Sequence, residues 1–440
     1  MEILSLGEKI KRRRKELGMT LKDLAGERIT PGQISLVESG KSNPSMDLLE
    51  YLANKLSTSV EYIMESEETQ AEKICLFYEN VAETYIISND LVQAQHNIES
   101  ALYYAEKYKL ENRKANILYL RATIHMLKGE EILAQQLFLS ANVIFIKNNC
   151  YEEVVKTFIK LGKITLDLKA YHSASSYFQQ AEKVFVDNSI ANDFLIGEIY
   201  YFTAMTFLKL ENITRAINYT YLAKEKFAQI NDKERYAKSM MLLAEEYSKQ
   251  GHLEEAIKYS KKSLELFKDI NNVNYLAQIE NNMGRLFSEF ENIEESFIHL
   301  NKAREIRRLN GDRKLIETLI NICENHIKLK NVSSGKEVLK DIYSYIEKHP
   351  GDELESNIDL MNYYLLKHKI DRMEDELVEA ENSLFQALNI AKENDIKKKI
   401  GEISILLGKF YVETGNESKA SVYLIGGVQV FKDLGLIKDF

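Results

Sequence analysis

Residues 241–263 read MLLAEEYSKQGHLEEAIKYSKKS, and the pattern in this stretch decides the fold of most of the chain. Small residues stand at Ala244, Ala256 and Ser263, and Gln250-Gly251 falls between the first two. Gly tolerates the left-handed backbone that ends a helix. Because small side chains let paired helices approach closely, the stretch predicts two helices joined by a short turn.

The same spacing recurs with a period of about 40 residues, and a period of this length is typical of repeat architectures. We expect nine helical hairpins over residues 71–435. The eighth, at about 353–393, is irregular, and Glu-rich residues 373–381 are expected to extend its second helix. The small residue of each second helix is, in order, Ala94, Ala134, Ala174, Ala216, Ala256, Ser296, Gly335, Ala380 and Ala420.

The composition supports an all-α fold. Three prolines and no tryptophan in 440 residues argue against a loop-rich β architecture, because Pro and Gly punctuate turns. With 45% hydrophobic and 28% charged residues, the chain can bury a large core. It has no apolar run near the roughly 18 residues of a membrane span, and its first residues do not resemble a secretory signal. We therefore expect a cytoplasmic protein with no membrane partner.

The residues that carry catalysis or bind metals form no recognisable pattern. Cys75, Cys150 and Cys323 are odd in number and far apart, which excludes a disulfide framework or a paired-cysteine metal site. The eight histidines are scattered. We expect no metal, no cofactor and no enzymatic activity.

The N-terminal segment has a different pattern. Residues 20–45 read TLKDLAGERITPGQISLVESGKSNPS. Thr20 and Thr30 are good helix N-caps, and Pro31 suits the first position of a helix. Residues 1–64 are therefore predicted to form five short helices, of which the second and third follow the helix-turn-helix plan.

A basic stripe lies in the first of these helices. The chain carries a net charge of −9, yet residues 9–15 read KIKRRRK. A local basic stripe on an acidic chain points to contact with nucleic acid in this segment alone.

The segment resembles the Xre/Cro-type helix-turn-helix family over about 60 residues, through LGMTLKDLA at 17–25 and ISLVESGKSNPS at 34–45. In that family the third helix enters the major groove, and a dimer binds two half-sites of double-stranded operator DNA. Gln33 is then placed to read a base edge. The resemblance implies DNA contacts from Lys9, Arg12, Arg13, Thr20, Thr30, Pro31, Gly32, Gln33, Ser35, Leu36 and Lys41.

The repeats resemble tetratricopeptide repeats with longer helices, which implies a right-handed superhelix with a concave face. Together the two parts resemble the peptide-pheromone receptors of Gram-positive bacteria, the Rap/Rgg/NprR/PlcR/PrgX group. The resemblance implies a homodimeric, quorum-sensing transcription regulator that binds a short signalling peptide in the concave groove. Residues 1–64 are then the DNA-binding domain, 65–70 a short acidic linker, and 71–435 the peptide-binding and dimerisation domain.

The first helix of each tetratricopeptide hairpin lines the groove. Counting from its small residue, the positions six and three before it and one after it face inward. Asn side chains suit a bound peptide, because they donate and accept hydrogen bonds at once, so Asn281 and Asn116 are the leading candidates. The predicted peptide contacts are Asn116, Tyr119, Glu198, Tyr201, Lys238, Met241, Glu245, Gln278, Asn281 and Arg285.

Two other functions fit the same pattern. The repeats are also compatible with binding a response regulator and sequestering or dephosphorylating it, as related phosphatases do. Those phosphatases use a Gln on an N-terminal helical bundle, which the helix-turn-helix replaces here. The third possibility is a constitutive repressor whose repeats only dimerise.

Overall fold

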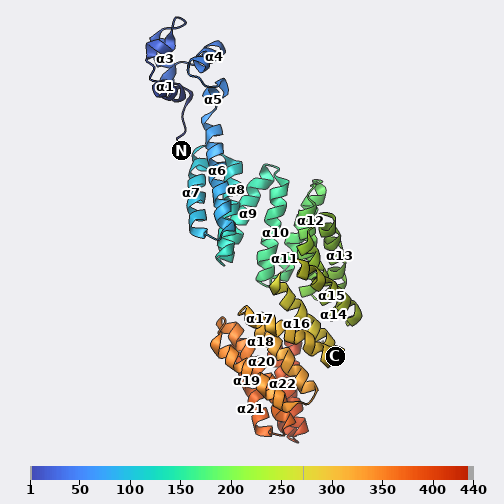
Figure 1. The fold of residues 1–440 in the computed structure, drawn as a ribbon. Coiled ribbons are helices and arrows are strands. Elements are labelled where there is room, and N and C mark those ends of the chain that lie inside the picture. The colour runs from blue at the N-terminus through green and yellow to red at the C-terminus, as the bar shows by residue number, and fades with distance from the viewer. Residues whose placement is uncertain (1, 271, 435–440) are drawn as a thin grey trace. The chain divides into compact units, whose positions relative to one another are not determined.

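The computed structural model describes residues 2–270 and 272–434, and every regular element in these ranges is an α-helix (Figure 1). The prediction of an all-α chain with an N-terminal helix-turn-helix and tetratricopeptide-like hairpins is confirmed. The chain divides into two compact units, unit 1 (residues 1–212) and unit 2 (residues 213–440). Among the residues described, no helix combines the length and apolar character needed to cross a bilayer.

Five short helices open unit 1, and a Ser or Thr side chain caps the N-terminus of each. Such caps satisfy backbone N–H groups that have no partner inside the helix. Ile10, Leu24, Ile34 and Leu52 form the centre of their shared core. The helices are α1 (Leu6–Glu16), α2 (Leu21–Ala25), α3 (Pro31–Glu38), α4 (Met46–Lys55) and α5 (Val60–Met64).

The repeat helices follow almost without a break. Ser66 caps α6 through the N–H of Thr69, so this helix begins at Glu67. The expected linker at 65–70 is therefore mostly helical, and only Glu65 and Ser66 separate α5 from α6. The remaining helices of unit 1 are α6 (Glu67–Ile87), α7 (Leu91–Lys107), α8 (Glu111–Leu127), α9 (Glu131–Lys147), α10 (Tyr151–Asp167), α11 (Tyr171–Asp187) and α12 (Asp193–Lys209).

Unit 2 continues the same alternation. The expected extension of the second helix over 373–381 is correct for 377–381, which lie in α21, and wrong for 373–376, because α20 ends at Met373 and the chain turns at Asp375 (φ 62°). The helices are α13 (Ile213–Gln229), α14 (Lys233–Lys249), α15 (Leu253–Ile270), α16 (Val273–Glu289), α17 (Ile293–Leu309), α18 (Leu315–Lys328), α19 (Val332–Lys348), α20 (Glu353–Met373), α21 (Leu377–Glu393), α22 (Lys397–Glu413) and α23 (Glu417–Asp433).

The small residues of the repeat lie where paired helices touch. In the α10–α11 hairpin, Gly162 faces the fully buried ring of Phe178. A Cβ atom on Gly162 would lie 2.5 Å from Cε1 of that ring. Ala174, the small residue of the second helix α11, is also fully buried. The spacing that predicted the hairpins therefore reflects how closely their helices approach.

We predict that Gly162→Ala destabilises unit 1. The added methyl overlaps the Phe178 ring, and overpacking of this kind costs about 1–3 kcal/mol. The free energy of unfolding in urea should fall by that amount.

Gly426→Ala is the matched control. Gly426 lies inside α23 with nothing within 4 Å of the new Cβ. Since Ala favours a helix over Gly by about 0.5–1 kcal/mol, this variant should be as stable as the native chain or more so. Equal effects of the two substitutions would contradict the close-packing account.

Candidate functional site

Helix α3 presents one apolar face inward and one mixed face to solvent. Ile34 and Val37 are buried against the other short helices. Gly32, Ser35 and Leu36 are exposed on the opposite face, and Leu36 keeps 46% of its surface. These exposed residues belong to the predicted DNA-contacting set, as does exposed Pro31 at the start of the helix.

The N-terminus of α3 is held by a reciprocal pair of hydrogen bonds. Thr30 Oγ1 accepts from the Gln33 N–H (3.3 Å), and Gln33 Oε1 accepts from the Thr30 N–H (3.1 Å). Gln33 was predicted to read a base edge, but in this structure its carbonyl oxygen caps the helix. Thr20 is likewise exposed and forms a capping box with Asp23 at the start of α2.

The basic run in α1 separates into surface and interior residues. Arg14 donates to both carboxylate oxygens of Glu38 (2.6 and 2.9 Å), which ties α1 to α3. Arg12 lies on the surface and pairs with Glu16 at 3.1 Å. Arg13 donates to the Leu56 carbonyl at 3.1 Å and is partly exposed. Arg13 also pairs with Glu16 at 3.0 Å, so Arg12 and Lys41 are the predicted phosphate contacts that are exposed.

Lys9 is buried and does not belong to the surface set. Only 1% of it is exposed, and its ammonium donates to the backbone carbonyls of Tyr62 (2.9 Å) and Glu65 (2.7 Å). Its charge therefore satisfies carbonyls at the C-terminal end of α5, where cations are favourable. Burial lowers the pKa of Lys9, which the Glu65 carboxylate at 3.7 Å opposes. We correct the prediction that Lys9 contacts DNA: this side chain holds α1 to α5.

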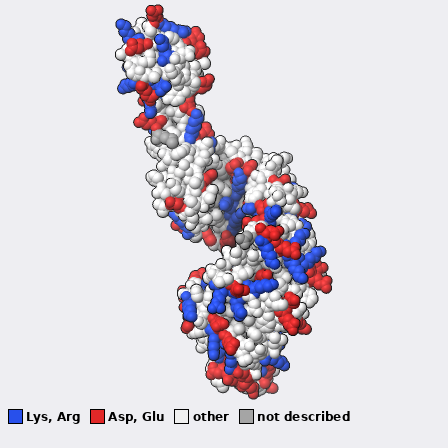
Figure 2. All heavy atoms as spheres, viewed as in Figure 1, with Lys and Arg blue, Asp and Glu red and all other residues white. Residues whose placement is uncertain are grey.

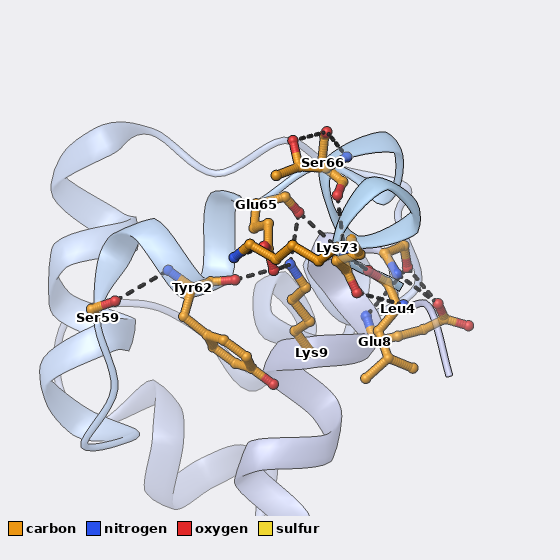
Figure 3. Close-up of polar contacts among 11 residues, drawn as sticks. Leu4, Glu8, Lys9, Ser59, Tyr62, Glu65, Ser66 and Lys73 are labelled. Atoms are coloured by element: carbon orange, nitrogen blue, oxygen red, sulfur yellow. Dashed lines mark hydrogen bonds and ion pairs between the residues drawn. The ribbon is translucent and has the colours of Figure 1, made fainter. Parts of the chain in front are cut away.

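The same region joins the short helices to the first repeat helix (Figure 3). The Gln70 side chain on α6 pairs with the Leu4 backbone, accepting its N–H at 3.1 Å and donating to its carbonyl at 2.8 Å. Glu65 also forms an ion pair with Lys73 at 2.6 Å. These contacts fix the N-terminal helices directly on α6.

The opposite half of α6 lines a pocket of about 250 Å³. Glu79 and Glu83 form its α6 side, and Asn116 and Tyr119 its α8 side. Glu79 is 4% exposed, and one of its carboxylate oxygens has no hydrogen-bond partner. Burial raises the pKa of Glu79, although Arg113 donates to it at 3.3 Å. The full lining is Glu79, Glu83, Asn116, Tyr119, Leu120, Phe145, Glu153 and Lys156.

The other predicted peptide contacts of unit 1 lie on α12. Glu198 accepts a hydrogen bond from Lys163 at 3.1 Å. Tyr201 is partly buried, and its ring packs edge-on against Phe202 with centroids 5.3 Å apart. Two of the four candidates in this unit, Asn116 and Tyr119, therefore share one pocket.

The candidates of unit 2 have varied surroundings. Lys238 pairs with Glu234 at 2.7 Å and lies 4.8 Å from the Tyr275 ring centroid. Gln278 lines a separate pocket of about 540 Å³. The residues around a narrow cavity of about 10 Å³ include Met241, Glu245 and Arg285.

Asn281, a leading candidate, faces the interior of unit 2. It is 1% exposed, its amide donates to Glu317 at 3.2 Å, and its oxygen accepts from Asn321 at 3.1 Å. Because both ends of the amide already bond to neighbouring helix α18, we withdraw Asn281 from the ligand-facing set.

Three charged residues of the pocket were not among the predicted peptide contacts, although they lie in the same inward-facing register. Glu79 and Glu83 lie three before and one after Ala82, and Lys156 lies six before Gly162. The inward-facing rule, applied to the first and third hairpins as well, identifies all three of them.

Comparison with known proteins supports both parts. A helix-turn-helix family matches residues 10–63, and the tetratricopeptide repeat family matches residues 237–270. The transcriptional activator NprA of Geobacillus stearothermophilus is 22% identical over 316 residues, which are 69% of this chain and 73% of that protein.

Two solved structures share the fold. The apo form of the quorum sensor NprR from B. thuringiensis is 14% identical with a TM-score of 0.53, covering 97% of this chain and 100% of that one. Aspartyl phosphate phosphatase F from Bacillus subtilis is 18% identical with a TM-score of 0.55, covering 83% of this chain and 94% of that one.

The fold and the family matches define a protein that joins a helix-turn-helix domain to tetratricopeptide-like repeats. In this arrangement the chain is similar to the transcriptional activator NprA and to the quorum sensor NprR, and so to the Rap/Rgg/NprR/PlcR/PrgX group. These comparisons confirm the resemblance stated from the sequence.

We predict that Lys9→Met destabilises the N-terminal helices. Met keeps the aliphatic stem but leaves the Tyr62 and Glu65 carbonyls without their donor, and a buried unsatisfied group costs about 1–3 kcal/mol. Hydrogen exchange of amides in α1 and α5 should speed up accordingly. Lys11→Met, at an exposed position of the same helix, should leave the exchange rates unchanged. If both variants exchange like the native chain, the junction does not depend on Lys9.

A second prediction concerns pH. Glu246 in α14 is fully buried, accepts from Thr220 at 2.7 Å, and has one oxygen without a partner. Burial raises its pKa to about 8. The folded chain therefore holds a proton that the unfolded chain releases above its ordinary pKa of 4.5. This contribution to stability is complete at low pH and is lost as the pH rises to about 8.

Glu246→Gln removes that loss. The free energy of unfolding of the variant, relative to the native chain, should rise by about 1.4 kcal/mol per pH unit across this window. Urea denaturation between pH 5 and 8.5 measures it, and Glu254→Gln, at an exposed position of α15, is the control. Parallel pH profiles for the native chain and Glu246→Gln would contradict the assignment.

Proposed function

We propose that the chain is a cytoplasmic, quorum-sensing transcription regulator. In this proposal a homodimer binds double-stranded operator DNA through the helix-turn-helix domain. A short signalling peptide, bound by the first helices of the repeat hairpins, changes the DNA affinity. The relatives named as a transcriptional activator and as a quorum sensor support this proposal.

The DNA side is supported by the surface of α3. Its N-terminus is exposed and capped, and such an end attracts phosphate. Ser35 and Leu36 project from the exposed face and are the proposed base contacts. Arg12 and Lys41 are the proposed backbone contacts, which position a protein on DNA without reading its sequence.

The peptide side is supported by the pocket between α6, α8 and α10. It combines an aromatic wall, Tyr119, with the amide of Asn116 and charges of both signs. An extended peptide presents unpaired backbone N–H and C=O groups, and an amide side chain satisfies either kind.

One observation carries the proposal: helix α6 runs without interruption from the DNA-binding domain to this pocket. Gln70 contacts Leu4 of the domain, and Glu79 lines the pocket. Nine residues separate them, which is about 14 Å along a helix. A peptide that shifts the pocket end of α6 therefore also shifts the domain fixed to its other end.

We predict that Gln70→Ala uncouples the two sites. DNA binding without peptide should stay within about twofold of native, since no proposed DNA contact is removed. The change in affinity caused by peptide should shrink by half or more. The assay is fluorescence anisotropy with promoter DNA from the chain's own locus. The peptides are synthetic C-terminal segments, 5–10 residues long, of small secreted proteins encoded beside it.

Two controls accompany this assay. Glu68→Gln, at an exposed position in the first turn of α6, should behave like the native chain. Lys41→Ala should weaken binding to all DNA sequences and reduce the slope of log affinity against log salt concentration by about 1.

DNA binding that ignores every peptide would favour the constitutive repressor. Absence of DNA binding would direct attention to a phosphorylated response regulator, whose dephosphorylation by the chain is then the assay.

A further inference from the structure

Three lysines form a stripe on α10. Lys156, Lys160 and Lys163 lie four and three residues apart, so they share one face of the helix. Figure 2 shows Lys and Arg side chains gathered over the part of unit 1 where α8 to α10 lie. The stripe begins at the pocket described above, because Lys156 is one of its lining residues.

The middle lysine differs from the other two. Lys156 pairs with Glu152 at 2.9 Å, and Lys163 pairs with Glu198 at 3.1 Å. In the parts of the chain that the structure describes, Lys160 makes no ion pair and no hydrogen bond through its ammonium group. It is nonetheless only partly exposed, and burial lowers its pKa.

The register of the repeat makes this lysine unusual. Lys160 lies two residues before Gly162, the small residue of its helix. In the other first helices of unit 1, the same register holds Asn80 in α6, Leu120 in α8, which lines the pocket, and Phe202 in α12. Lys160 is the charged residue among these four. An unpaired, partly buried cation is costly, and a bound anion relieves that cost.

The adjoining pocket carries more acidic than basic side chains. Its walls include Glu79, Glu83 and Glu153 beside Lys156, which pairs with Glu153 at 3.7 Å, and one oxygen of buried Glu79 has no partner. Glu153 and Lys160 lie seven residues apart on α10, which is about 10 Å. An extended peptide covers that distance with about three residues.

We propose that Lys160 binds a carboxylate of the peptide, while the acidic pocket receives a positively charged group about three residues away. This inference rests on the proposed peptide-binding function and specifies its ligand: a short peptide carrying a carboxylate and a cation. The carboxylate is either the peptide C-terminus or an Asp or Glu side chain, and the two sources are separated by experiment.

The test uses the full-length chain and three synthetic heptapeptide mixtures, each with one Lys near the N-terminus. The first has a free C-terminus and no acidic residue. The second is amidated with no acidic residue, and the third is amidated with one Asp. Peptides that co-elute with the chain in size-exclusion chromatography are quantified by mass spectrometry.

We expect the native chain to retain the first or the third mixture at least about tenfold better than the second, as a charge-assisted hydrogen bond allows. Retention of the first mixture alone identifies the C-terminal carboxylate, and retention of the third mixture alone identifies a side-chain carboxylate.

Lys160→Met should abolish the preference and Lys160→Arg should restore it. Lys183→Met, at an exposed position of α11, should keep it. Thermal melting checks folding, and Lys160→Met should melt no lower than native.

Other outcomes overturn the inference in distinguishable ways. If Lys160→Met keeps the native preference, the carboxylate site is wrong while peptide binding stands. If the native chain retains the neutral amidated mixture equally well, no carboxylate is recognised. If the native chain retains none of the mixtures, the proposed peptide function fails and the inference fails with it.

Discussion

The repeat part of this chain depends on close contact between paired helices, which only a small side chain permits. Gly162 lies against Phe178, Gly284 against Leu300, and a Cβ on either glycine would lie 2.5 Å from its neighbour. This contact fixes how each first helix is rotated about its axis. The rotation in turn brings Glu79, Asn116 and other residues of one register to a common surface. The candidate ligand pocket is therefore a consequence of helix packing.

The second constraint is the short connection between the two kinds of structure. Ser66 starts α6 only two residues after α5 ends, and Lys9, Gln70 and Lys73 bind across the junction. The domain that carries α3 is thus fixed to a helix whose far half borders the pocket. In the proposed function, α6 is therefore the element through which a ligand in unit 1 and the proposed DNA-contacting surface influence one another.

Part of the candidate site was readable from the sequence because it follows local rules. Thr30 and Pro31 set the start of α3, and counting from the small residue placed Asn116 and Tyr119 in one pocket. The predictions that the structure contradicts concern polar residues whose bonding partners lie far along the chain. Lys9 bonds to carbonyls 53 and 56 residues away, and Asn281 bonds to Glu317, 36 residues away.

The sequence by itself determined the helices, their caps and the repeat period, because these depend on backbone preferences within a few residues and on side-chain size. It did not determine the turn at Asp375, where a residue other than Gly adopts positive φ. Only the tertiary structure decided which polar side chains bond inside the protein and which remain available to a ligand. Nothing in the sequence distinguishes the partners of Lys9 from those of Lys160. Packing gives the first two carbonyl partners, while the second makes no ion pair in the described structure.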